Sequence, residues 1–197
     1  VGFDFDMKEV IEGLEESIAG ETPSLNETEC IQAISIGQEE NFQKLSIKNL
    51  EEAESFIKET SKKNGILEVE KDKLYYIIET EGTGAAVEAH HSPTIRYTGN
   101  FLNGELLGSS EGKDEKISLE ETLPGLAKGV VGMKEGEKRT LYIHPDLAYG
   151  TSNYCPPNSL LIFNVEVIKS NTASKEVDTT ASVEETSLNE TMEEVVR

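Results

Sequence analysis

The feature that most limits how this chain can fold is its segment 26–63, which contains no proline and only one glycine. Asn26 and Glu29 have the spacing of a helix N-cap and its partner three residues on, and predict where a helix begins. Asn64 and Gly65 form a turn signal that predicts where it stops. At 1.5 Å per residue such a helix is about 57 Å long, more than the diameter of a small domain. We therefore expect a helix that reaches beyond any one globular domain.

This long helix carries only a sparse apolar stripe on a highly charged background. The stripe consists of Ile31, Ile34, Leu45, Phe56 and Ile57. A helix with so few apolar residues cannot bury itself within a compact fold. One interpretation is a solvent-bridging helix with salt-bridged faces. The other is a stalk that connects a dimerisation element to a second domain.

A shorter helix is predicted before it, in residues 3–19. Asp4 or Asp6 can cap its start and Gly20 can end it. Its apolar residues recur at helical spacing and are Met7, Val10, Ile11, Leu14 and Ile18. This one-sided stripe has no other partner in the sequence, so we expect the chain to form a homodimer through residues 3–36.

From Leu67 onward the apolar period becomes strand-like. Short alternating or apolar runs are separated by glycine- and asparagine-rich turns, and a single short helix is predicted within residues 122–136. This pattern predicts an α+β fold in which a curved antiparallel sheet wraps on one short helix. We expect four regions: an N-terminal helical dimerisation segment (1–25), a long connecting helix (26–65), a sheet domain (66–169) and a disordered acidic tail (170–197).

The charge of the chain excludes several kinds of partner. It has 38 acidic and 18 basic residues and a formal net charge of −20. Phosphate backbones and anionic headgroups repel such a chain, so we expect no nucleic-acid partner. It contains no apolar run long enough to span a bilayer and no basic-then-apolar start, so we expect no membrane helix and no signal peptide in this sequence.

The reactive side chains form no recognisable catalytic or metal-binding pattern. Cys30 and Cys155 lie far apart and form no CxxC. Neighbouring residues on a strand point to opposite faces, so we expect His90 and His91 to chelate a metal poorly. His144 precedes a proline at the end of a predicted strand, and no GxSxG, P-loop or HExxH motif occurs. We therefore expect no metal and no cofactor.

What does recur in order along the predicted domain is a set of apolar and aromatic residues at the ends of strands. The three segments are IRYTGNFLNGELLGSS, LPGLAKGVVGMKEGEKRTLYIHPDLAYG and PPNSLLIFNVEVI. Residues of these types line an apolar pocket better than they transfer protons.

These three segments, in this order, resemble the FK506-binding-protein (FKBP) type of peptidyl-prolyl cis-trans isomerase. The preceding helices are similar to the N-terminal region of the Mip (macrophage infectivity potentiator) type, and the last two segments resemble Mip proteins of chlamydial bacteria. That family's N-terminal domain usually starts with another helix, so we expect this sequence to lack its extreme N-terminus.

The resemblance implies an isomerase that assists protein folding by twisting X–Pro bonds in an apolar pocket. The implied partners are proline-containing peptides, unfolded proteins and, weakly, FK506- or rapamycin-type ligands. The alternative is a chaperone or peptide-binding dimer whose degenerate pocket is inactive. A structural or adhesive role is a third possibility. The family also implies a periplasmic or outer-membrane, cell-surface location.

The resemblance assigns catalytic roles to three aromatic residues. Tyr97 matches the tyrosine that walls the pocket, and Tyr149 the one whose hydroxyl bonds the carbonyl of the ligand. Phe163 matches the aromatic floor of the last strand. Leu123 matches the residue whose backbone N–H binds ligand, and Ile117 falls near a wall phenylalanine.

Other substrate-binding positions depart from the family pattern. Leu107 and Gly108 replace a phenylalanine and an aspartate, and Leu126 replaces a tryptophan. Cys155 lies in a shortened loop before the two prolines. We therefore expect a pocket that has lost its carboxylate, leaves the Tyr97 hydroxyl without that partner and is less active than is usual.

Overall fold

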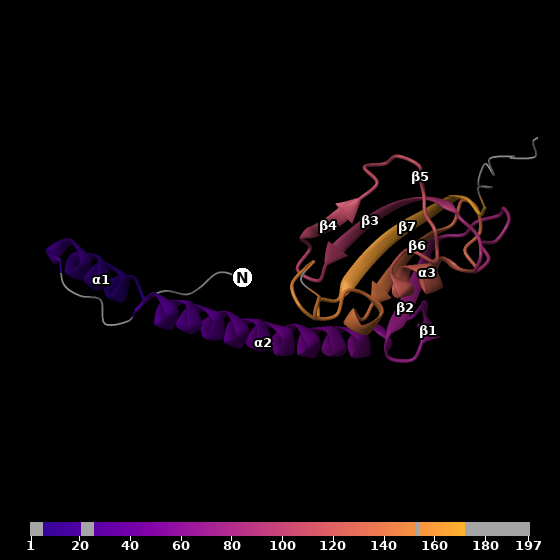
Figure 1. The fold of residues 1–197 in the computed structure, drawn as a ribbon. Coiled ribbons are helices and arrows are strands. Elements are labelled where there is room, and N and C mark those ends of the chain that lie inside the picture. The colour runs from indigo at the N-terminus through magenta and orange to yellow at the C-terminus, as the bar shows by residue number, and fades with distance from the viewer. Residues whose placement is uncertain (1–5, 21–25, 153, 172–197) are drawn as a thin grey trace, which may run out of the picture.

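A long helical arm and a sheet domain make up the protein. The computed structural model describes residues 6–20, 26–152 and 154–171. The arm consists of α1 (Met7–Ala19) and α2 (Glu27–Thr60). Figure 1 shows α2 running away from the domain, which it meets only with its C-terminal part.

Helix α1 begins after Asp6, one of the two predicted caps, and ends at Gly20 as the sequence predicts. The Asp6 side chain accepts a hydrogen bond of 2.9 Å from the backbone N–H of Lys8, and Gly20 closes the helix with a φ of 78°. The helix buries none of its residues. Its predicted apolar stripe is therefore exposed.

Helix α2 starts with the predicted capping box and ends slightly earlier than expected. Asn26 and Glu29 cap each other reciprocally, with distances of 2.8 and 3.0 Å. The last helical residue is Thr60, three short of Lys63. Thr60 is fully buried, and the chain turns directly after it to enter the sheet. With 34 residues, the helix is about 51 Å long.

The two halves of α2 lie in different environments. Ile31 and Ile34 are exposed on the N-terminal half. On the C-terminal half, Ala53 and Ile57 are buried in a cluster with Tyr75 and Leu160 of the domain. The helix therefore docks on the domain with its C-terminal half and is exposed along its N-terminal half.

The domain is a seven-stranded antiparallel sheet. The strand order is β1-β2-β6-β7-β3-β4, and β5 pairs with β3. The strands are β1 (Ile66–Glu70), β2 (Leu74–Thr80), β3 (Thr94–Phe101), β4 (Leu106–Ser109), β5 (Glu115–Lys116), β6 (Lys138–Ile143) and β7 (Leu161–Lys169). A short helix, α3 (Pro124–Val130), lies against the sheet, and a 3₁₀ turn, η1 (Pro145–Leu147), follows β6.

The alternation of side chains along the strands separates two apolar clusters. Leu74 and Leu141 belong to the main core with α3, whereas their neighbours Tyr75 and Tyr142 belong to the cluster that α2 covers. Each of these strands therefore buries both of its faces near α2. This explains why they are apolar at consecutive positions.

Two glycines allow α3 to approach the sheet closely. A Cβ atom at Gly125 would lie 2.2 Å from the Ile143 side chain, and one at Gly129 would lie 2.6 Å from Leu141. Because protein interiors are close-packed, a larger residue at either position would push the helix away from β6.

The predicted α+β architecture, a curved antiparallel sheet on one short helix preceded by a helical arm, is confirmed. No helix among the described residues combines the length and the apolarity needed to cross a membrane. The predicted disordered tail lies outside the described residues from residue 172 onward, as do residues 1–5 and 21–25 of the predicted dimerisation segment.

Candidate functional site

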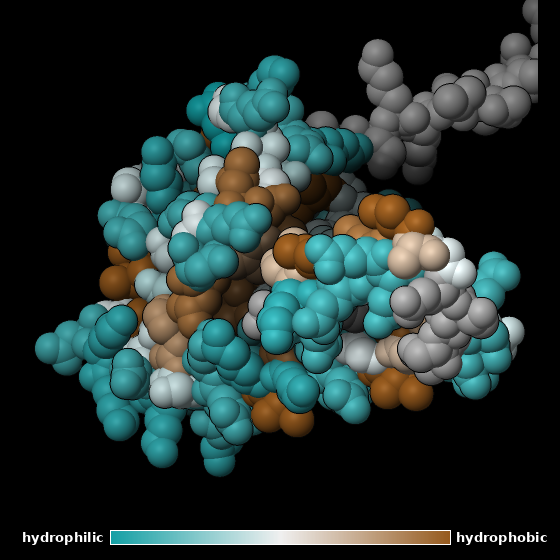
Figure 2. Space-filling view, turned by 90° about the vertical axis from the view of Figure 1, so that its left-hand side faces the viewer, coloured by the Kyte–Doolittle hydropathy of each residue, from teal (hydrophilic) through white to brown (hydrophobic). Residues whose placement is uncertain are grey.

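One cavity of the domain, with a volume of about 320 Å³, collects all but one of the predicted site residues. It is bounded by β3, β4, β5, the start of α3, the segment after η1 and the middle of β7. Figure 2 shows, from the side of the arm, that hydrophobic side chains gather on one part of the domain surface among hydrophilic ones. The cavity is lined by Tyr97, Leu107, Gly108, Glu115, Ile117, Thr122, Leu123, Leu126, Tyr149 and Phe163.

The floor of the cavity depends on the pairing of β3 with β7. Gly99 lies opposite Phe163 in this pairing, and a Cβ atom at Gly99 would lie only 2.7 Å from the Phe163 ring. The missing side chain therefore lets the ring lie across β3. The rings of Tyr97 and Phe163 are 6.1 Å apart at an angle of 42°, within the range of favourable aromatic pairs.

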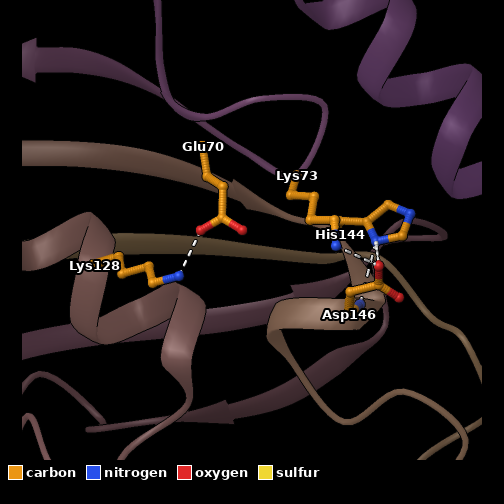
Figure 3. A network of polar contacts seen from close by, with 5 residues as sticks. All are labelled: Glu70, Lys73, Lys128, His144 and Asp146. Atoms are coloured by element: carbon orange, nitrogen blue, oxygen red, sulfur yellow. Dashed lines mark hydrogen bonds and ion pairs between the residues drawn. The ribbon is translucent and has the colours of Figure 1, made fainter.

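Tyr149 reaches the cavity from the turn that follows β6. His144 caps η1, and its Nδ1 atom accepts a hydrogen bond of 3.2 Å from the backbone N–H of Asp146. The Lys73 ammonium binds the Asp146 carboxylate at 2.8 Å, and Figure 3 shows these side chains converging below α2. Gly150 then donates its backbone N–H to the Pro145 carbonyl at 3.1 Å. These contacts determine where the chain leaves η1 and carries Tyr149.

Two groups around η1, Asp146 and His144, have lowered pKa values for different reasons. The hydrogen bond from Lys73 lowers the pKa of Asp146, and burial lowers the pKa of His144 despite the opposing effect of Asp146.

Figure 3 also shows the Lys128–Glu70 ion pair, which connects α3 to the end of β1.

The start of α3 contributes two further lining residues. Leu123 is the N-cap residue and its side chain provides no capping hydrogen bond. Leu126 lies three positions on, and residues at this spacing share one face of a helix. Both therefore face the cavity, with Leu126 buried and Leu123 partly exposed.

The expectation that the pocket lacks a carboxylate is wrong. Glu115 of β5 lines the cavity together with Tyr97, and its carboxylate acts on the Tyr97 hydroxyl. Burial, together with the Glu115 charge, raises the pKa of Tyr97. The register explains the contact: Glu115 pairs with Ile95, which shares its face of β3 with Tyr97. A two-residue strand leaves no period in the sequence, so sequence analysis missed Glu115.

Cys155 does not line the cavity, in contrast to the prediction from the sequence. The segment after it turns towards α2 instead. There the side-chain amide of Asn49 donates a hydrogen bond of 2.7 Å to the Pro157 carbonyl, and that of Asn158 donates one of 2.9 Å to the Ser46 hydroxyl. Cys155 is half-buried, and burial raises the pKa of its thiol, which keeps the thiol protonated and weakly nucleophilic.

The histidine pair lies in a turn and not on a strand, so the argument that the two rings point apart does not hold. Ligand atoms of Glu88, His90 and His91 all lie within 4.8 Å of one another. However, Nδ1 of His91 accepts a hydrogen bond of 3.1 Å from the Glu88 backbone N–H. In a neutral ring this arrangement places the proton on Nε2, the nitrogen that faces the other two groups. The cluster is therefore arranged for hydrogen bonding and not for metal coordination.

Two protein-family models match the chain, and together they define its class. The first, described as FKBP-type peptidyl-prolyl cis-trans isomerase, covers residues 84–168. The second, described as the domain amino-terminal to FKBP-type peptidyl-prolyl isomerase, covers residues 1–78. The chain belongs to the FKBP-type peptidyl-prolyl cis-trans isomerase family, as its motifs predict.

Among curated proteins, the chain is similar to Mip peptidyl-prolyl cis-trans isomerases of Chlamydia. It is 47% identical to that of Chlamydia pneumoniae over 167 residues, which are 84% of this chain and 65% of that protein. It is 44% identical to that of Chlamydia trachomatis over 171 residues, 86% of this chain and 70% of that protein. The predicted resemblance to chlamydial Mip proteins is confirmed. The matches leave about a third of each relative's length uncovered.

Solved structures support the fold. FkpA from Escherichia coli superposes with a TM-score of 0.71 at 24% identity, covering 85% of this chain and 83% of that one. A peptidyl-prolyl cis-trans isomerase from Pseudomonas syringae gives a TM-score of 0.58 at 25% identity, covering 62% and 93%. The first similarity includes most of the helical arm as well as the domain.

Proposed function

We propose that this protein catalyses cis-trans isomerisation of X–Pro bonds in peptides and unfolded protein chains. The observation that carries this proposal is the convergence of Tyr97, Tyr149 and Phe163 on one apolar cavity of about 320 Å³. Membership in a family of peptidyl-prolyl isomerases supports it. No bond is made or broken in this reaction, so a nucleophile and a proton relay are not required.

The physical problem is rotation about a partial double bond. Resonance in the amide gives a barrier of roughly 18–20 kcal/mol. Water that donates hydrogen bonds to the carbonyl favours this resonance. A cavity that removes this water and fits the twisted bond better than the planar one lowers the barrier, because binding energy is then larger in the transition state.

The residues of the cavity have different roles in this catalysis. The rings of Tyr97 and Phe163 exclude water around the proline. The hydroxyl of Tyr149 is a donor for a carbonyl of the peptide. The Tyr97 ring packs against Phe163, and its hydroxyl lies where the Glu115 carboxylate acts on it.

We also propose that activity and affinity for FK506- or rapamycin-type ligands are lower than is usual for such a pocket. Leu107 and Leu126 present less surface than the aromatic residues that the family pattern places there. A buried aromatic side chain contributes roughly 150–250 Å² of contact area. The lost contact reduces binding of both the ligand and the twisted peptide bond.

The test is the cis-to-trans exchange rate of a short X–Pro peptide, measured by NMR exchange with and without the protein. Tyr149→Ala and Phe163→Ala should each abolish most of the acceleration. The matched control is Tyr154→Ala, because this ring lies 6.2 Å from Tyr149 but is 88% exposed and outside the cavity. Equal losses in the control and in the two cavity variants would exclude this cavity as the catalytic site.

A second proposed function rests on the exposed apolar stripe of the arm. We infer that two copies of the chain associate through α1 and the first turns of α2, and that the resulting dimer holds unfolded proteins. The supporting observation is that Met7, Leu14 and Ile18 of α1 and Ile31 of α2 are all at least half exposed. Large apolar patches of this kind on a protein surface mark association sites.

Light scattering at micromolar concentration tests the dimer. Leu14→Asp should shift the mass from two copies to one, because it places a charge in the stripe. Glu15→Asp changes its immediate neighbour without altering charge and should leave the mass unchanged. A monomeric wild-type protein would contradict the dimer. Suppression of aggregation of an unfolded protein by Phe163→Ala, without isomerase activity, would establish the chaperone role separately.

For localisation we propose the periplasm or the cell surface, because the sequence resembles Mip-type proteins. Fractionation of the native bacterium, with detection by antibody beside a cytoplasmic marker, tests this. Recovery with the cytoplasmic marker alone would contradict it.

A further inference from the structure

The substrate cavity carries a negative charge that nothing in its lining neutralises. Glu115 is the only acidic residue that lines it among the residues that the structure describes, and none of the lining residues is basic. Within the described chain Glu115 forms no ion pair. Two of the bases near it pair with other carboxylates: Arg96 binds Asp114 at 2.7 Å, and Lys113 binds Glu111 at 3.5 Å. Lys116 follows Glu115 in β5, and successive residues of a strand point to opposite faces.

The position of Glu115 allows it to contact a bound peptide. It is an exposed residue at the rim of the cavity, on the short strand β5. A carboxylate has about four lone-pair sites, so Glu115 can act on the Tyr97 hydroxyl and still accept from a bound peptide. At Gly108, which lines the same cavity, a Cβ atom would have no neighbour within 4 Å. This part of the rim is therefore open to a side chain of the peptide.

We propose that Glu115 makes this cavity prefer peptides that carry a lysine or an arginine directly beside the proline. The inference rests on the proposed isomerase function and names the substrate class that this site favours. With the proline ring in the apolar part of the cavity, the flanking residues lie at the rim, where Glu115 attracts a cation and repels a carboxylate. Leucine or phenylalanine gains no such attraction.

The expected preference is modest, because an exposed pair is screened by water. Exposed ion pairs of this kind correspond to roughly two- to fivefold in an equilibrium or rate ratio. The chain as a whole is strongly acidic, with a net charge of −20, and this charge also attracts basic peptides at long range. A single-residue comparison is therefore needed to isolate Glu115.

The experiment compares peptides with lysine, glutamine or glutamate directly before, and in a second series directly after, the proline. Both kcat/KM and the binding affinity are measured by NMR, so the preference is testable even where turnover is slow. Wild-type protein should favour lysine over glutamate by about two- to fivefold in at least one series. Glu115→Gln should reduce this ratio towards one, to the value that the net charge of the rest of the chain gives. High salt should reduce it in the wild type as well.

The matched control is Glu111→Gln, which removes one carboxylate from the same β4–β5 loop at a residue outside the cavity. It should retain the wild-type ratio. The proposal is overturned if wild-type protein shows no preference in either series, or if Glu115→Gln and Glu111→Gln show the same ratio. Isomerisation of every peptide at one rate refutes this specificity alone, whereas absence of both catalysis and binding refutes the proposed function itself.

Discussion

The side-chain amide of Asn49 in α2 donates a hydrogen bond of 2.7 Å to the backbone carbonyl of Pro157 in the loop before β7. Next to it, Asn158 donates its side-chain amide to the Ser46 hydroxyl at 2.9 Å and its backbone N–H to the Gly150 carbonyl. Gly150 directly follows Tyr149. The helical arm thus holds the loop that positions one of the cavity's tyrosines, although α2 contributes no residue to the cavity.

Asn49→Ala should therefore lower isomerase activity as well as stability. It leaves a partly buried carbonyl without its donor, which costs about 1 kcal/mol in the free energy of unfolding. The loosened loop should lower kcat/KM several-fold. Gln43→Ala is the control, because its hydrogen bond to Glu39 lies within the helix. Urea denaturation and peptide exchange rates measure the two effects, and unchanged activity with reduced stability would show that the loop does not need the arm.

Gly99→Ala should displace the Phe163 ring from the cavity floor. The new methyl group would lie 2.7 Å from the ring, and overpacking of this kind costs roughly 1–3 kcal/mol. Gly108→Ala is the stability control, because a Cβ atom there meets nothing within 4 Å. We expect a loss of activity and a lower urea midpoint for Gly99→Ala only. Equal midpoints for both variants would contradict the close approach.

Leu126→Trp should strengthen binding of FK506-type ligands. An aromatic side chain at the base of the cavity adds contact area with the ligand. Leu126 is buried, so we also expect a stability loss of about 1–3 kcal/mol from overpacking. The chain contains no tryptophan, and the introduced indole therefore reports binding by its own fluorescence, beside calorimetry on the wild type. A weaker affinity than wild type would place Leu126 away from the ligand.

Gly108→Asp in the wild-type background should bring little gain, because Glu115 already supplies a carboxylate that lines the cavity and acts on Tyr97. Two carboxylates in one cavity repel each other. Gly108→Asp combined with Glu115→Gln should retain catalysis, since the tyrosine keeps one acceptor. Peptide exchange rates of the single and double variants measure this. A clear gain from Gly108→Asp alone would show that Glu115 does not serve the same role.

Stability should fall as the pH drops below the ordinary histidine pKa of 6.5. Burial lowers the pKa of His144 in the folded state, with Lys73 acting in the same direction and with Asp146 and Glu54 opposing. The unfolded chain then binds a proton that the folded chain does not, so the stabilisation is complete above pH 6.5 and is lost as the pH falls towards the folded-state pKa.

His144→Asn should flatten this part of the pH profile, because asparagine can still accept the capping hydrogen bond at η1. The free energy of unfolding from urea titrations on both sides of pH 6.5 measures it. Lys73 lowers the pKa of Asp146 from 3.8, so protonation of Asp146 affects the free energy of unfolding only at a more acidic pH. Parallel profiles for the two proteins would show that His144 is not the titrating group.

Much of the fold could be predicted because its signals are local. The capping box of Asn26 and Glu29 spans four residues, and the stripe of α1 repeats within each turn of the helix. The alternation of the strands predicted the sheet, and the resemblance of the three segments to the FKBP type implied the family and most residues of the cavity. These features depend on residues that are close together in the sequence, so the sequence pattern indicates them directly.

Three features were decided by contacts between distant segments. Tyr97 and Glu115 are brought together by the pairing of β3 with β5. The segment after Cys155 turns away from the cavity because Asn49, 108 residues before Pro157, binds it. The C-terminal half of α2 docks on the domain because Tyr75 and Leu160 present an apolar face to Ala53 and Ile57. The sequence by itself therefore determined the elements and the family. The tertiary structure decided the charge of the cavity and the docking of the arm, because hydrogen bonds and burial between remote residues follow from folded geometry and leave no periodic trace in the chain.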